Sequence, residues 1–127
     1  MDTDQLAEQG LALRKQLFGA DAVEQRMRAF GEFGAPLQHI INAYAYGDVW
    51  SRPGLPIATK CLAMIAMMAA AGKPAELRVH INGALQSGCT PDEIREILLL
   101  VALYCGIPAA NEAHRAAVEV MKERDKT

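Results

Sequence analysis

The feature that most constrains the fold is an apolar segment, Ile57–Ala71, enclosed between Pro56 and Gly72. Nearly every position in this segment is apolar, so a helix formed by it has no polar face to turn toward water. The longest uninterrupted apolar run, Cys61–Ala71, is too short to span a bilayer as a helix. The segment therefore predicts a buried central helix.

Glycine and proline residues divide the rest of the chain into further helical segments, and no segment alternates convincingly at period two. The clearest helix start is Thr90-Pro91-Asp92-Glu93. Thr90 is a typical N-cap, Pro91 suits the first helical position and Glu93 completes a capping box. The predicted helices are 3–18, 21–30, one that Pro36 opens and Gly47 closes, 57–71, 74 to 86 or 87, 91–105 and 108–121.

The composition predicts one soluble domain, 1–127, with no linker or repeat. Hydrophobic residues make up 51% of the 127 positions, which is enough to bury a core. The net charge of −2 and the lack of a basic run argue against nucleic-acid binding. The first ten residues are too acidic for a signal peptide. Cys61, Cys89 and Cys105 match no zinc or C-x-x-C spacing, which favours reduced thiols in the cytoplasm.

Glu76 and His80 are the residues whose spacing most directly suggests chemistry. At positions i and i+4 of a predicted helix, they share one face. A carboxylate there can hold the imidazole ring and raise its pKa toward neutrality, which suits a proton-transfer catalyst. The spacing alone fits an ordinary solvent-exposed Glu–His pair better than a catalytic one.

Three segments together resemble the carboxymuconolactone decarboxylase family, which includes the alkylhydroperoxidase D-like (AhpD-like) proteins. They are Tyr44–Pro56, Glu76–His80 and Tyr104–Asn111, and the resemblance covers nearly the whole chain. It implies an all-α, AhpD-like helical bundle of six to seven helices. It also implies a homo-oligomer built on trimers, commonly a hexamer, with sites near the subunit contacts.

The chain departs from the peroxidase branch of that family, which resembles Cys-x-x-Cys-x-x-x-His on a helix. If His80 matches that histidine, Lys73 and Glu76 occupy the thiol positions. These two residues cannot form a disulfide, so thiol peroxidase activity through that centre is excluded. The resemblance therefore points to acid–base chemistry.

The activity that the resemblance implies is decarboxylation of 4-carboxymuconolactone to 3-oxoadipate enol-lactone, in protocatechuate degradation. The departing carboxylate sits on a ring carbon that connects through a carbon–carbon double bond to the lactone carbonyl, so the bonding electrons can flow to the carbonyl oxygen. No organic cofactor or metal is then needed. The protein must supply a cationic clamp for carboxylates, donors for the enolate oxygen and a proton donor.

The expected site residues follow from these needs. His80 is the candidate proton donor, and Glu76 orients it. Arg52, in the Trp50–Pro56 loop, is the candidate carboxylate clamp because a guanidinium grips a carboxylate with two bonds, although a plain surface arginine fits equally. Trp50 and Tyr46 are candidate pocket walls or local packing anchors, and Asn111 is a candidate substrate contact, helix cap or interface residue.

Some alternatives remain open at this stage. Arg78 lies two positions from both Glu76 and His80, so it fits an ion pair or subunit contact better than a substrate contact. No metal site is expected, because His39 and His114 lack partners at ligand spacing. Cys105 fits a buried helix end better than a nucleophile. The alternative function is an AhpD-like oligomer that binds a small acid without turnover, or acts on a related acid.

Overall fold

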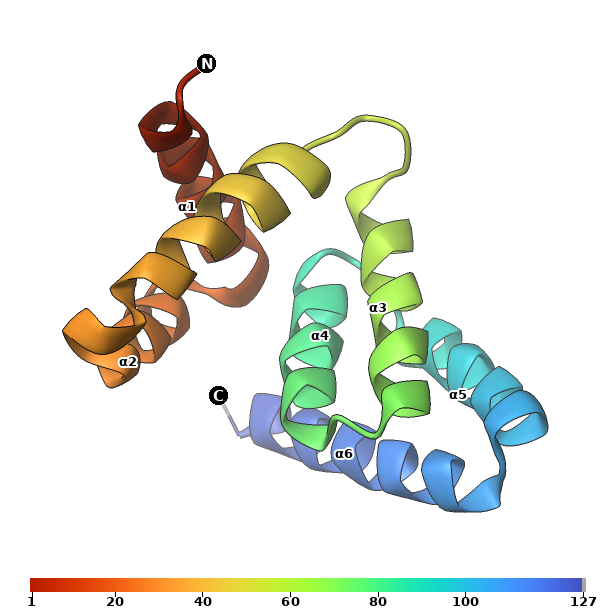
Figure 1. The fold of residues 1–127 in the computed structure, drawn as a ribbon. Helices are drawn as coiled ribbons and strands as arrows, with labels where there is room; N and C mark the ends of the chain where they lie inside the picture. Colours follow the sequence, from red (N-terminus) through yellow and green to blue (C-terminus); the bar gives the residue numbers. More distant parts are fainter. Residues whose placement is uncertain (127) are drawn as a thin grey trace. The chain divides into compact units, whose positions relative to one another are not determined.

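The computed structural model describes residues 1–126, which form six α-helices, one π-helical segment and no strand (Figure 1). The predicted all-α fold is confirmed. The chain forms two compact units, Met1–Leu55 and a second that begins at Pro56. The organisation as a single domain stays a prediction. Among the described residues, no helix combines the length and apolarity that crossing a membrane requires.

The first unit contains α1 (Thr3–Phe18), α2 (Ala20–Ile40) and the π-helical segment η1 (Ile41–Val49). Helix α1 begins with a capping box in which the Asp2 side chain accepts from the Gln5 backbone N–H at 2.8 Å, and the Gln5 side chain accepts from the Asp2 N–H at 3.0 Å. It ends at Gly19, as predicted. Helix α1 packs against η1 and α2, and Figure 1 shows it passing behind the rod formed by η1 and the end of α2.

The predicted boundary at Pro36 is wrong. Helix α2 instead breaks at Gly31, whose φ of 57° lies in the left-handed region that glycine tolerates. The second leg therefore starts before Pro36, which lies inside it. The helix also passes Gly47 and continues to Val49 with π-type bonding. The Trp50 N–H extends this pattern by donating to the Ala45 carbonyl at 2.8 Å.

Two glycines bring the backbones of α1 and η1 into direct contact. A Cβ atom built at Gly10 would overlap the carbonyl oxygen of Asn42 and lie 2.6 Å from the Gly47 nitrogen. A Cβ atom at Gly47 would overlap the Leu6 carbonyl oxygen. Only glycine fits at these two positions, because the atoms in the way are backbone atoms.

The second unit contains α3 (Ile57–Ala71), α4 (Pro74–Gln86), α5 (Pro91–Cys105) and α6 (Ile107–Asp125). The predicted starts of α3, α4 and α5 are confirmed, whereas α6 starts one residue earlier and runs four residues longer than predicted. The capping box of α5 is present: the Glu93 N–H donates to Thr90 Oγ1 at 3.1 Å, and the Thr90 N–H donates to the Glu93 carboxylate at 2.8 Å.

All four helices contribute to the core of the second unit, and α6 runs crosswise to α3 and α4 in Figure 1. Its largest fully buried side chains are Cys61, Ile65, Leu77, Ile81, Ile94, Leu98 and Val120. Helix α3 is not buried all round as expected: its fully buried residues are the stripe Cys61, Ile65 and Ala69, and Met67 is half exposed. Cys105 is exposed, so the expectation that it is buried is also wrong.

The contact between α1 and η1 yields a stability prediction. Alanine in place of glycine inside a helix normally stabilises it by about 1 kcal/mol. We expect Gly10→Ala to destabilise the chain instead, by about 1–3 kcal/mol, because the added methyl group forces two backbones apart. Thermal unfolding at fixed protein concentration measures the change.

Gly54→Ala is the matched control. A Cβ atom at Gly54 meets nothing within 4 Å, and its φ is not positive. We therefore expect it to change stability by no more than about 0.5 kcal/mol. Equal melting temperatures for the two variants would contradict the close approach described above.

Candidate active site

Helix α4 carries the predicted acid–base pair, and its two members differ in burial. His80 is 4% exposed and lies between the buried residues Leu77 and Ile81. Glu76 is exposed in the first turn of α4, where the helix dipole stabilises its negative charge. The Glu76 carboxylate forms no hydrogen bond or ion pair with another residue of the described chain. The structure thus places the pair on one helix, but the predicted contact is not formed.

Arg78, between them, forms an ion-paired bridge to α6, which confirms the preferred interpretation of this residue. Its guanidinium donates to Glu119, and to Glu123 Oε1 at 2.8 Å. Beside it, Asn82 donates to the Arg78 carbonyl at 3.2 Å and accepts from Arg124 at 3.3 Å. These bonds fix α4, and with it the backbone of His80, against α6.

Arg52 lies in the predicted loop after η1, in the first unit. Its Nε donates to Asp48 Oδ1 at 3.0 Å, and its side chain is 68% exposed. The hydrogen bond and charge of Asp48 raise the pKa of Arg52, so the guanidinium is always cationic. The residue is accessible to an anion, and a carboxylate that binds it competes with Asp48.

Tyr46 and Trp50 stack on each other in the first unit, with ring centroids 5.4 Å apart and planes 21° apart. Phe18 of α1 packs edge-on against Tyr46 at 5.8 Å. Both Tyr46 and Trp50 are buried. These contacts are typical of packing anchors, one of the two interpretations that the sequence left open. The other, a role as pocket walls, stays a prediction.

Asn111 is exposed in the first turns of α6, in the second unit. His114, one turn later, has Nδ1 2.7 Å from the Ala110 carbonyl oxygen of its own helix. Within residues 1–126, no group of three or more His, Cys, Asp or Glu side chains is arranged to hold a metal ion.

Sequence reasoning missed a buried polar cluster in the first unit. The Arg14 guanidinium Nη1 donates to Gln38 Oε1 at 2.9 Å and to Asn42 Oδ1 at 3.0 Å, and all three residues are buried. The guanidinium carbon also lies 5.9 Å from the centre of the Tyr46 ring. One signal was present: Arg14 falls on the same helical stripe as Gly10 and Leu17, the buried face of α1.

Comparison with known proteins identifies the family. The model of the carboxymuconolactone decarboxylase family matches residues 35–119. The chain is 39% identical over 97% of its length to a 4-carboxymuconolactone decarboxylase of Acinetobacter baylyi, of which 92% is covered. It is 37% identical over 85% of its length to the nitrosuccinic acid decarboxylase NpaB of Metarhizium robertsii, of which 76% is covered.

A third relative is an uncharacterised 15.0 kDa protein of Paracoccus denitrificans, 32% identical over 64% of the chain and 62% of that protein. The family match covers the last 21 residues of the first unit and most of the second. The chain belongs to the carboxymuconolactone decarboxylase family.

Proposed function

We propose that this chain is a carboxy-lyase that converts 4-carboxymuconolactone to 3-oxoadipate enol-lactone and CO₂ in the degradation of protocatechuate, within the β-ketoadipate pathway. One observation carries the proposal: the similarity to the Acinetobacter decarboxylase extends over 97% of this chain at 39% identity. We also infer a cytoplasmic location, which is supported by three free cysteines, two of them buried.

The substrates named for the two decarboxylases share a chemical logic. In nitrosuccinic acid, the carboxylate that can leave sits on the carbon bearing the nitro group, which accepts the electron pair. In 4-carboxymuconolactone, the conjugated lactone carbonyl accepts it. Both acids also carry a second carboxylate on a neighbouring CH₂, so each contains a succinate unit. A protein that acts on such acids needs to bind carboxylates and deliver one proton.

We assign the proton delivery to His80. As CO₂ leaves, the carbon–carbon bonding pair moves through the ring double bond to the lactone oxygen. The imidazolium then gives its proton to the ring carbon next to the carbonyl and recovers one from solvent. With 4% of its surface exposed, this imidazole meets a substrate only where little bulk water enters, which strengthens its interaction with the developing negative charge.

The other assignments are binding and positioning roles. Arg52 is a carboxylate clamp, supported by its exposed, permanently charged guanidinium. Glu76 is a positioning residue, one helical turn before His80. Its carboxylate forms no hydrogen bond or ion pair among the described residues and is available to turn toward the imidazolium. Tyr46 and Trp50 contribute an aromatic wall, and Asn111 an exposed amide.

The first prediction concerns turnover without added groups. We expect the purified chain, treated with a chelator and dialysed, to release CO₂ from 4-carboxymuconolactone at an undiminished rate, because the substrate stabilises its own carbanion. Manometry or enol-lactone absorbance measures the rate, with nitrosuccinate assayed in parallel. A folded, chelator-treated preparation that is inactive on the lactone would count decisively against the proposal. Turnover of nitrosuccinate alone would instead favour the differently specific alternative.

The second prediction tests the acid–base pair. We expect His80→Gln to lower kcat by about two to four orders of magnitude, the usual contribution of general acid catalysis. Glu76→Gln should lower kcat over the same range. It should also move the fall of kcat at high pH to lower pH, because the imidazolium loses a neighbouring negative charge.

His114→Gln and Glu96→Gln are the controls, because both residues lie outside the proposed site, on α6 and α5. Each should keep the parent rate and pH profile. If His80→Gln kept full activity and only lowered the melting temperature, His80 would be a structural histidine. The family assignment would then stand without this mechanism.

We further propose that copies of this chain associate as a trimer-based oligomer, with a hexamer as the expected form. The apolar surface of α5 supports this proposal. Leu99, Leu100, Leu103 and Tyr104 are each more than half exposed there. Next to them, α3 and α5 line an almost wholly apolar cavity of about 300 Å³, which includes Met67. Association of copies would remove this surface from water.

The third prediction concerns this surface. We expect sedimentation at micromolar concentration to show an oligomer, and Leu103→Glu to shift it to smaller species because a charge cannot be buried there unpaired. Ala12→Glu, which adds the same charge at an exposed position of α1, should leave the distribution unchanged. A stable monomer for the parent chain would refute the proposed assembly.

A further inference from the structure

Arg14 determines how two buried amide side chains are oriented. Gln38 is 3% exposed and Asn42 is 5% exposed, and each accepts a hydrogen bond from the same guanidinium nitrogen. A guanidinium has donors only, so the oxygen of each amide must be the atom that faces it. The two NH₂ groups therefore point away from Arg14. Exchanging the oxygen and nitrogen of either amide would break its bond to Arg14, because an amide NH₂ group cannot accept from a guanidinium.

Both NH₂ groups remain available as donors. No residue of the described chain accepts a hydrogen bond from either of them. Neither nitrogen is a fully buried atom without a partner, so each one reaches accessible space. Donors on side chains this deeply buried are normally satisfied, because an unmet one costs free energy. These two can be satisfied only from the space that they face.

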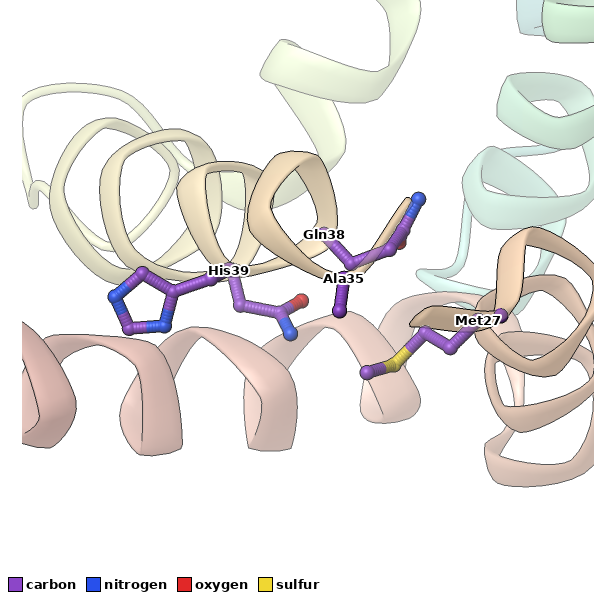
Figure 2. A pocket seen from close by; sticks show the side chains of 6 residues that line it. Met27, Ala35, Gln38 and His39 are labelled. Carbon is purple, nitrogen blue, oxygen red and sulfur yellow. The ribbon is translucent and has the colours of Figure 1, made fainter. Parts of the chain in front are cut away.

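The first unit contains a cavity of about 200 Å³ beside these two residues. Gln38 and Asn42 line it together with Met27, Gly31, Ala35 and His39. The break at Gly31 allows both legs of α2 to contribute: Figure 2 shows Met27 extending from the first leg toward Ala35 on the second. Met27 and Ala35 supply an apolar wall. His39 adds an imidazole on the same leg as Gln38.

We propose that this cavity binds a small carboxylic acid through the amide NH₂ groups of Gln38 and Asn42. Each NH₂ group can donate to a carboxylate oxygen. The positive charge of Arg14 lies directly behind them and polarises both amides toward donation. The charge also makes an anion the favoured occupant over a neutral amide or alcohol. No acidic residue lines the cavity to oppose an anion.

This site does not depend on the proposed decarboxylase activity. It uses α1, α2 and η1, whereas the proton donor proposed above lies on α4. An inactive chain could still bind a carboxylate in this cavity, and an active enzyme could lack it. The two proposals therefore fail separately.

Calorimetric titration of the full chain with succinate tests the site, with neutral succinamide as the control ligand. We expect succinate to bind and succinamide not to bind. Asn42→Asp should weaken binding at least about tenfold, because it keeps an acceptor for Arg14 but replaces the donor facing the cavity with a carboxylate oxygen. Its melting temperature should not fall, since the guanidinium gains an ionic partner.

Three further variants make the outcome decisive. Gln38→Glu should repeat the loss, and it replaces Asn42→Asp if that variant fails to fold. Gln16→Glu, an exposed position two residues after Arg14, adds the same charge and should bind succinate normally. His80→Gln should also bind normally. Absence of binding to the parent chain, or unchanged affinity in both Asn42→Asp and Gln38→Glu, overturns the proposal.

Discussion

The direct approach of two backbones, at Gly10 on α1 and Gly47 on η1, determines what the first unit can bury. A side chain at either position would collide with backbone atoms of the other helix. Because the helices meet this closely, Arg14, one turn after Gly10, reaches Gln38 and Asn42, and Phe18 reaches the Tyr46 ring. Burying a guanidinium is costly unless it is well bonded, so the glycine contact and the polar cluster require each other.

The second unit positions its key helix by a different means. Helix α4 buries Leu77 and Ile81 in a hydrocarbon core, and charged residues join its outer face to α6 through Arg78. These ion pairs are partly exposed, so each contributes little to stability by itself. Their value is geometric, because they define which face of α4 turns inward. His80 lies on that inward face.

Local signals in the sequence predicted most of the helix ends. The Thr90 capping box, the left-handed Gly72 and the Gly19 stop all act within one turn, so a window of a few residues contains them. The predicted helix 21–30 ends at the observed break at Gly31, but the start of the next leg was misplaced because a proline commonly occupies the first position of a helix. The π-helical bonding of η1, which packs against α1, has no local sequence signature.

Only part of the candidate site could be predicted by the same reasoning from the sequence. Spacing placed Glu76 and His80 on one helix but gave no access to their burial, which depends on residues far away in the chain. The Arg14 cluster joins positions 24 and 28 residues apart. An isolated arginine on an apolar stripe marks such a cluster, but its partners become visible only once the helices are packed.

The start of α4 explains how one scaffold could serve both thiol and acid–base chemistry. Lys73 is the N-cap of this helix, and Glu76 lies in its first turn. By the resemblance described above, these are the positions that two cysteines occupy in the peroxidase branch. A helix N-terminus favours negative charge, so it would stabilise a thiolate there just as it stabilises the Glu76 carboxylate. Replacing the thiols keeps an anion near the histidine and removes the redox couple. On the proposed mechanism, the electrostatic field of the helix N-terminus suits both reactions, and the residues placed in it determine whether electrons or protons are exchanged.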